Sequence, residues 1–158
     1  MDRLLQAVKP LAEEDLIVRS PRQSNTWIEG RVSLAISNDT VNNMLCIRLD
    51  GGLYPKGDIC DWLIIGILGA RDVRGALIEL KGRHVEKAIE QLEKTIGKLK
   101  NRLNNCMPNL QTAIVVSRGG KIPMSTWQIK QRHFIKTYHV KLTRESNGST
   151  KVLSDILI

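Results

Sequence analysis

Cysteine and histidine are scarce in this chain of 158 residues and are widely scattered along it. The sequence has three cysteines and three histidines: Cys46, Cys60, Cys106, His84, His133 and His139. No CxxC pair or Cys/His cluster has the spacing of zinc ligands. The pattern argues against a zinc finger or a disulfide-bonded scaffold, and we expect the cysteines to be reduced, structural thiols.

Long hydrophobic runs are absent as well. The longest, from Trp62 to Ala70, has nine residues, whereas a membrane-spanning helix needs about twenty. The first residues mix Gln, Lys and Pro among leucines and lack the apolar centre of a secretory signal. We therefore expect a cytoplasmic protein with no membrane partner. The sequence also lacks internal repeats, low-complexity tracts and linkers, which favours a single domain over residues 1–158.

Positive charge is what the chain has in excess. It contains 24 Lys and Arg residues against 16 Asp and Glu residues, a formal net charge of +8, and its pI is about 9.7. Such an excess favours polyanionic partners such as nucleic acid, because each cation placed on a phosphate releases condensed counterions. An ordinary basic surface is the alternative interpretation.

Hydrophobic periodicity outlines strands and helices in the centre of the chain. Apolar runs predict four strands, over Met44–Leu49, Cys60–Leu68, Ala76–Lys81 and Leu110–Ser117. An apolar stripe with a repeat of three or four positions predicts a long helix over Arg83–Leu103. A further helix is expected from a cap at Ser125 to about Tyr138.

The two ends of the chain carry weaker signals. We expect a short first helix over Leu11–Arg19 and a polar loop over Ser20–Thr26, whereas Val32–Ile36 fits either a strand or part of a helix. A terminal hairpin is expected around an Asn147-Gly148 turn, from Val140–Thr143 and Lys151–Leu157. The whole order predicts an α/β sandwich with a mixed sheet.

Charged residues interrupt two of the apolar strands. Glu79 and Lys81 are two positions apart, so they point to the same face of their strand. If this strand pairs with the preceding one as an antiparallel hairpin, Asp61 meets them at the open end. Two carboxylates and the Leu80 backbone carbonyl suit Mg²⁺ or Mn²⁺, and Lys81 can orient water or offset charge on a phosphate. The alternative is an edge-strand ion pair with Asp61 in a turn.

These segments resemble the PD-(D/E)xK nuclease superfamily, which includes restriction endonucleases and archaeal Holliday-junction resolvases. The resemblance lies in Cys60–Ile64, Ala76–Gly82 and Ala88–Leu92. It implies a restriction-endonuclease-like αβββαβ core and a metal-dependent endonuclease acting on nucleic acid, with DNA as the expected substrate. A homodimer or a partner subunit is compatible with it. The alternative function is a catalytically silent subunit that binds nucleic acid or protein in a defence or repair complex.

The motif assigns roles to individual residues. Asp61 takes the place of the motif aspartate, and Glu79 and Lys81 take that of the (D/E)xK pair. Gln91 matches a helix glutamine that some members place near the site. Members that use a first-helix glutamate imply Glu14 or Glu13 as a further metal ligand.

One position departs from the motif, and one aspartate competes with Asp61. Cys60 stands where many members have proline. Asp58 lies three residues before Asp61, so on a regular strand it would face the other way, and Gly57 favours a turn there. We therefore prefer Asp61 and keep Asp58 as the alternative.

Candidate nucleic-acid contacts lie towards the C-terminus. They are the basic residues Arg118, Lys121, Lys130 and Arg132. Trp127, Phe134 and Tyr138 are interleaved with them, but a spacing of 7 and 4 is helix-face spacing and favours a place in the core. His84 is expected to start the long helix rather than to bind a metal.

Overall fold

A mixed six-stranded sheet forms the centre of the protein. The computed structural model describes residues 13–68 and 72–158. The sheet order is β1-β4-β5-β6-β7-β8, with bounds β1 Leu16–Arg19, β4 Met44–Arg48, β5 Trp62–Ile67, β6 Val73–Lys81, β7 Asn109–Ser117 and β8 Lys141–Ser146. Neighbours from β1 to β6 are antiparallel, and those from β6 to β8 are parallel.

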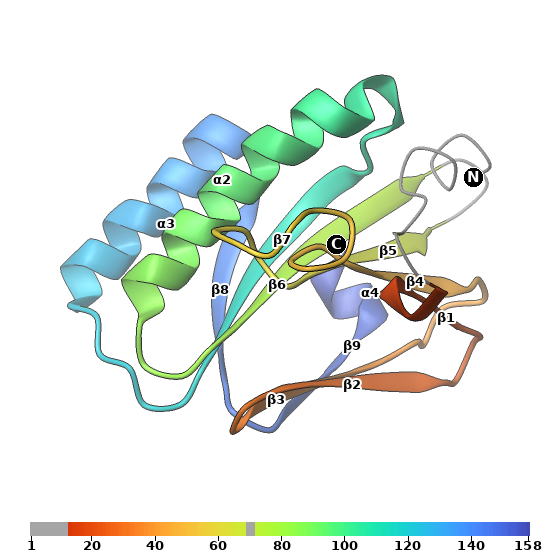
Figure 1. Ribbon diagram of the computed structural model, residues 1–158, viewed down its shortest axis with the longest axis horizontal. Coiled ribbons are helices and arrows are strands. Elements are labelled where there is room, and N and C mark those ends of the chain that lie inside the picture. Colours follow the sequence, from red (N-terminus) through yellow and green to blue (C-terminus); the bar gives the residue numbers. More distant parts are fainter. Residues whose placement is uncertain (1–12, 69–71) are drawn as a thin grey trace.

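Two helices cover one face of this sheet (Figure 1). Helix α2 (Val85–Leu103) connects β6 to β7, and α3 (Met124–Tyr138) connects β7 to β8, as parallel neighbours require a crossover. The apolar stripe of α2 is buried, and its members are Val85, Ala88, Ile89, Leu92, Ile96, Leu99 and Leu103. It packs on alternate residues of the strands, including Leu63, Leu77 and Val115. A short 3-10 turn, η2 (Asn104–Cys106), ends the helix.

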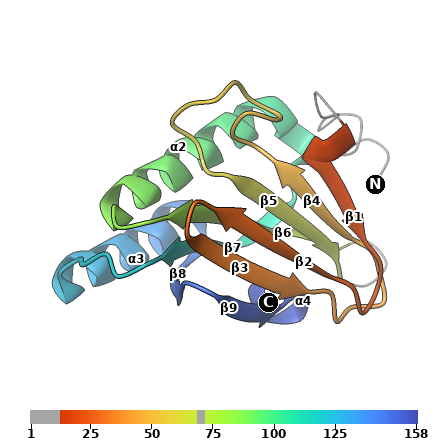
Figure 2. The same cartoon turned by 60° about the horizontal axis from the view of Figure 1, so that its bottom comes forward.

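A second, smaller sheet covers the other face (Figure 2). It has the order β2-β3-β9, with bounds β2 Ser24–Glu29, β3 Val32–Ser37 and β9 Ser149–Val152, and the short helix α4 (Leu153–Ile156) follows β9. The core between the sheets takes the other alternate strand residues, among them Ile64, Ile78 and Leu80. Because side chains alternate along β6, Glu79 lies on the helix-covered face.

The central elements are confirmed. The strands expected at Met44, Cys60, Ala76 and Leu110 are β4, β5, β6 and β7, and the long helix is α2. The ambiguous segment Val32–Ile36 is a strand, since it lies within β3. The α/β architecture with a mixed sheet is therefore as expected. Among the described residues, no helix combines the length and apolar character needed to span a membrane.

The expected first helix is wrong over the described residues. Residues 13–15 form the 3-10 turn η1 (Glu13–Asp15), and Leu16–Arg19 is β1; residues 11 and 12 lie outside the described part. The β-branched pair Ile17 and Val18 favours a strand, and pairing with β4 satisfies the backbone of this segment. The polar loop expected over Ser20–Thr26 is also too long, because β2 begins at Ser24.

The expected C-terminal hairpin is wrong, although its turn is present. β8 pairs with β7 in the large sheet, whereas β9 pairs with β3 in the small one. Ser33 of β3 draws the turn to the small sheet: its N–H donates to Asn147 Oδ1 at 2.8 Å, and its carbonyl accepts from the Gly148 N–H at 2.9 Å. Ser125 does not cap α3, which begins at Met124 after Pro123 without a side-chain cap.

Candidate functional site

Strand pairing brings Asp61 and Glu79 together. Trp62 of β5 is opposite Ile78 of β6 in the antiparallel register, so the next pair outward is Asp61 and Glu79. Asp61 Oδ2 accepts a hydrogen bond of 2.7 Å from the Leu80 N–H. The convergence expected at the open end of the hairpin is thus present in the structure.

Glu79 is a buried carboxylate with an incomplete set of partners. Its side chain is 1% exposed, and its Oε1 is 3.3 Å from Lys81 Nζ, whose side chain is 23% exposed. Its Oε2 is buried and has no hydrogen-bond partner within the described part of the chain. A buried charge costs free energy unless it is paired and hydrogen-bonded, so one oxygen of Glu79 is left in an unfavourable state.

Both carboxyl groups of the pair have a raised pKa. Burial, and after it the nearby charge of Asp61, raise the pKa of Glu79 to about 9, while Lys81 opposes the rise. Burial also raises the pKa of Asp61 to about 7, against the lowering effect of the Leu80 N–H. A bound cation would favour the ionised form of both groups.

Glu29, at the end of β2, is a third acidic residue at the site, and the sequence pattern did not point to it. Its carboxyl group is hydrogen-bonded to that of Asp61, and its charge raises the pKa of both Asp61 and Glu79. The local sequence offers one signal only, an acidic residue directly before the Gly30-Arg31 turn. Its place at the site depends on the small sheet lying across the large one.

The structure does not bring Glu14 to the site. Glu14 is exposed in η1, before β1, and β4 separates β1 from β5. Glu14 lines neither of the two pockets that Glu29 borders. The expectation fails because the segment is not a helix crossing the site. The side chain of Glu13 lies outside the described part of the structure.

Helix α2 holds the chain just before Asp61. Gln91 Nε2 donates to the Ile59 carbonyl at 3.0 Å. Thr95 Oγ1 accepts from the Cys60 N–H at 2.8 Å and donates to the Gln91 carbonyl at 2.6 Å. Gln91 therefore contacts the backbone that carries Asp61, and its own Oε1 is buried with no partner among the described residues.

Asp58, the alternative aspartate, is directed elsewhere. It is exposed and forms an ion pair with Lys94 of α2, with 3.2 Å between Oδ2 and Nζ. The hydrogen bond from Lys94 lowers its pKa. Of the two aspartates, Asp61 is the one beside Glu79.

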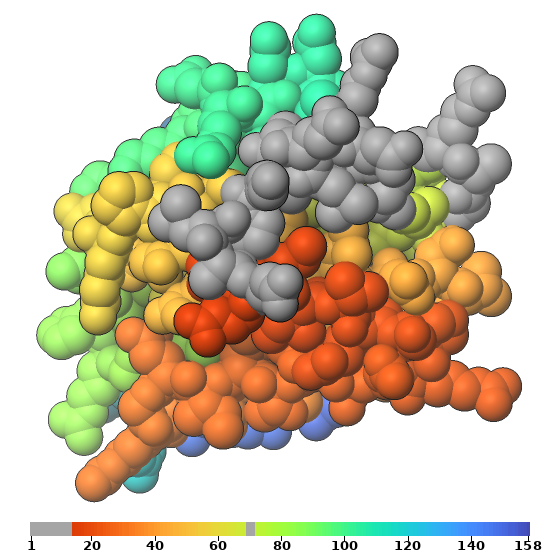
Figure 3. Space-filling view, turned by 45° about the vertical axis from the view of Figure 1, so that its right-hand side comes forward, coloured from red at the N-terminus to blue at the C-terminus, as the bar shows by residue number. Residues whose placement is uncertain are grey.

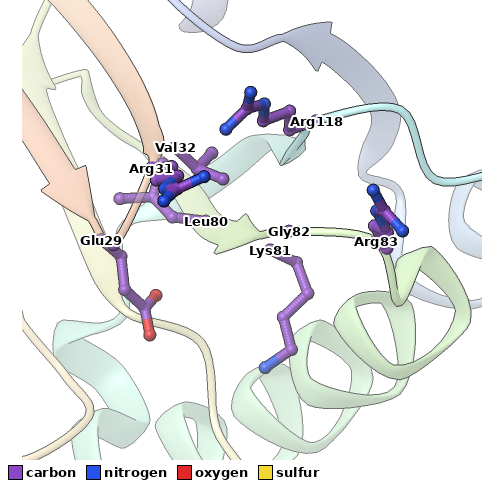
Figure 4. A pocket seen from close by; sticks show the side chains of 9 residues that line it. Glu29, Arg31, Val32, Leu80, Lys81, Gly82, Arg83 and Arg118 are labelled. Carbon is purple, nitrogen blue, oxygen red and sulfur yellow. The ribbon is translucent and has the colours of Figure 1, made fainter.

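Two pockets adjoin the acidic residues, and Glu29 and Leu80 line both. The larger has a volume of about 650 Å³ and includes Lys81 and three arginines, Arg31, Arg83 and Arg118 (Figure 4). The smaller, of about 370 Å³, includes Asp61, Trp62, Arg48, Asp50 and Lys56. The segment around residue 55 and the β2–β3 segment lie side by side on this surface (Figure 3).

The other basic candidates are dispersed. Lys121 is exposed and lines a separate hollow with Arg83 and His84 at the start of α2. Lys130 lies 3.8 Å from Glu93, and Arg132 is exposed on α3. The aromatic residues of α3 have the expected core role, since Phe134 is buried and Trp127 and Tyr138 pack against the same cluster.

The donor set can be compared with what a metal ion needs. Within residues 13–68 and 72–158, no three His, Cys, Asp or Glu side chains are arranged to hold a metal ion by themselves. Two neighbouring carboxylates fit Mg²⁺, which takes one or two protein carboxylates and keeps several waters. The unpartnered Glu79 oxygen and the two raised pKa values fit a cation at this place.

Comparison with protein-family models, with curated proteins and with solved structures gave no match.

Proposed function

We propose that the protein is a metal-dependent endonuclease that hydrolyses phosphodiester bonds of nucleic acid, with DNA as its expected substrate. The observation that carries the proposal is the buried Glu79 carboxylate, which has one unpartnered oxygen and lies opposite Asp61 and beside Lys81. Most buried side-chain oxygens have a hydrogen-bond partner, so an unpartnered oxygen on a fully buried acid favours a ligand-binding role. The order β4-β5-β6-α2-β7 supports a restriction-endonuclease-like core.

Each residue of the site has a role in this proposal. Asp61, Glu79 and the Leu80 carbonyl would hold Mg²⁺ or Mn²⁺, which when bound supplies positive charge at the phosphate and a more acidic water. Lys81 lines the larger pocket and is partly exposed, so its ammonium group can orient water or offset charge on the phosphate. Gln91 and Thr95 keep the backbone before Asp61 in place.

In this proposal Glu29, rather than a first-helix glutamate, supplies the additional acidic group. It reaches Asp61 from the small sheet and borders both pockets. In the ionised state it can accept a proton or bind a metal-bound water, which are the usual tasks of an extra carboxylate near a metal. The proposal therefore assigns it to the site with Asp61 and Glu79.

Cleavage assays with matched variants test the proposal. Supercoiled, branched and single-stranded DNA are incubated with Mg²⁺ or Mn²⁺, and with EDTA as the metal-free control. We expect metal-dependent cleavage by the wild type and a loss of at least about 100-fold in Asp61→Ala and Lys81→Ala, as for removal of a key electrostatic group. Asp58→Ala and Lys94→Ala are the controls, because they remove the same side-chain types from the exposed ion pair.

Two results would contradict the proposal in different ways. Absence of cleavage on every substrate, with no metal-induced rise in the melting temperature, would leave a silent nucleic-acid-binding subunit. Cleavage that survives in both Asp61→Ala and Lys81→Ala would show that other residues catalyse the reaction.

A further inference from the structure

The larger pocket has a strong excess of positive charge. Its lining includes four cationic residues, Arg31, Lys81, Arg83 and Arg118, and one acidic residue, Glu29. They come from the β2–β3 turn, the end of β6, the segment before α2 and the segment after β7 (Figure 4). Both sheets therefore contribute to the pocket, and one of its cations, Lys81, is paired with Glu79.

The arginines are not used within the fold. No ion pair or side-chain hydrogen bond joins Arg31, Arg83 or Arg118 to any residue in the described part of the chain. This differs from Arg74 and Arg144, whose guanidinium groups are bonded to neighbouring side chains and carbonyls. Unneutralised like charges around one pocket repel each other, and an anion placed between them removes that cost.

The backbone that carries Arg118 is firmly held. The Arg118 N–H donates to the Gly82 carbonyl at 2.8 Å, which ties the end of β7 to the end of β6. Gly120 lies so close to Arg83 that an added Cβ would clash with the Arg83 carbonyl oxygen. Arg144 binds the same segment through Ser117 Oγ, at 2.9 Å, and the Gly120 carbonyl. Arg83 and Arg118 are thus presented by a single fixed unit.

A sharp turn presents Arg31 from the opposite wall. Gly30 has φ +58°, a conformation that favours glycine, and it allows β2 to reverse directly into β3. Glu29 and Val32 on either side of the turn pair with each other. The turn therefore places one carboxylate against Asp61 and one guanidinium at the pocket, from neighbouring positions in the chain.

We propose that Arg31, Arg83 and Arg118 form a phosphate-binding subsite for the nucleotide next to the scissile phosphodiester. The planar guanidinium group binds phosphate oxygens in a two-point geometry that a lysine does not provide. A volume of about 650 Å³ lies in the range of small-molecule pockets of about 300–1,000 Å³ and can receive the backbone of one strand. The identity of the ligand rests on the proposed function, whereas the anion site itself rests on the three arginines.

The test measures binding without cleavage. Fluorescence anisotropy follows labelled single-stranded and duplex oligodeoxynucleotides in EDTA over a series of salt concentrations. The double variant Arg31→Gln/Arg118→Gln is compared with Arg22→Gln, which removes the same charge at the other end of β2. Melting temperatures confirm that each variant is folded.

We expect the double variant to bind at least about tenfold more weakly, with its salt slope reduced by about 2, because each of the two missing arginines leaves one phosphate un-neutralised. Arg22→Gln should remain within about twofold of the wild type. If the double variant loses more affinity for single strands than for duplex, the phosphate comes from a separated strand. If it loses more affinity for duplex, the phosphate comes from a duplex backbone.

The subsite is overturned if the double variant and Arg22→Gln bind the oligonucleotides with equal affinity. It is also overturned if polyglutamate of the same total charge displaces the oligonucleotide equally well from the wild type and from the double variant. Either outcome is independent of catalysis. A protein that binds through the arginines but never cleaves DNA would retain the subsite and lose the proposed function. A protein whose cleavage depends on Asp61 but whose binding ignores the arginines would give the opposite result.

Discussion

At the scale of single residues, burial of Glu79 lowers the stability of the metal-free protein and favours the binding of a cation. Its pKa of about 9 and that of Asp61, about 7, mean that the folded chain binds protons more tightly than the unfolded one. The contribution of these two groups to the free energy of unfolding should therefore be greatest below the ordinary pKa of a carboxyl group. It should fall as the pH rises from there through about 7 and about 9.

This dependence gives a prediction for Glu79→Gln in the absence of metal. At pH 8 the wild-type carboxyl must take up a proton when the chain folds, because its pKa rises to about 9 in the folded state, whereas the amide needs no proton. The variant should therefore be more stable than the wild type by at least about 1.4 kcal/mol, the worth of one pKa unit. The gain should vanish near pH 4, where the wild-type carboxyl is neutral. Urea denaturation in EDTA measures it. Adding Mg²⁺ should stabilise the wild type at pH 8 and leave Glu79→Gln nearly unchanged, and a variant less stable at both pH values would contradict this account.

Glu29 provides a second prediction at this scale. Its charge and its hydrogen bond raise the pKa of Asp61, so Glu29→Gln should lower that pKa towards its ordinary value. Carboxyl carbon chemical shifts measured by NMR through a pH titration report the change directly. Asp58→Asn, at the exposed ion pair with Lys94, is the control and should leave the Asp61 titration in place.

At the scale of elements, α2 serves the site through Thr95. Replacing Thr95 with Val keeps the shape of the side chain but leaves the buried Cys60 N–H without its acceptor. The expected loss is about 1–3 kcal/mol in the free energy of unfolding, because the donor remains buried and unpaired. Lys94→Ala, which removes an exposed ion pair from the same helix, should cost no more than about 1 kcal/mol. Equal losses in the two variants would contradict this role of Thr95.

The interior of α2 also contains a glycine, which lowers the stability of the helix. Gly97 is exposed in the helix interior, and a Cβ added there would meet nothing within 4 Å. Gly97→Ala should therefore stabilise the protein by about 0.5–1 kcal/mol through helix propensity. Thermal unfolding measures the gain. Gly120→Ala, where the added Cβ would clash with the Arg83 carbonyl, should instead destabilise the protein and weaken oligonucleotide binding.

The elements that sequence reasoning identified correctly are those with local signals. The stripe of α2 and the apolar run of β5 show their periodicity within one segment. β1, by contrast, is a short strand whose partner β4 lies far along the chain, and the acidic residues that precede it, Glu13–Asp15, suit the start of a helix. The Asn147-Gly148 turn was predicted correctly, but the strands on either side of it join different sheets through long-range contacts. Turn chemistry alone does not reveal which edge a strand joins.

At the scale of the whole molecule, half of the candidate site could be predicted and half could not. Asp61, Glu79 and Lys81 belong to one hairpin, so alternation and pairing sufficed to bring them together. Glu29 and Arg31 reach the site only because the small sheet packs across the large one. No spacing within the sequence encodes that arrangement, since it follows from burial of Ile64, Ile78 and their neighbours beneath β2 and β3.

The two sheets should unfold as one unit. Trp27 and Trp62 lie 6.0 Å apart between ring centroids, one on each sheet, whereas circular dichroism reports chiefly on α2 and α3. In a Trp127→Phe background, tryptophan fluorescence and circular dichroism should give the same urea midpoint. Leu153 is a buried residue of α4 that packs in the core between the two sheets. Leu153→Ala should lower both urea midpoints together and reduce the free energy of unfolding by about 2–5 kcal/mol. Separate transitions would show that the small sheet is independently stable.

The position of β3 between β2 and β9 also sets an order of assembly during synthesis. β2 and β3 precede the strands of the β5–β6 hairpin in the chain, whereas β9 and α4 follow β8. A polypeptide emerging from the ribosome can therefore pair the strands that carry Asp61 and Glu79 before β3 receives its second neighbour. Until β9 has been synthesised, the nascent chain has an open β3 edge, and the sheet bearing Glu29 and Arg31 is still incomplete.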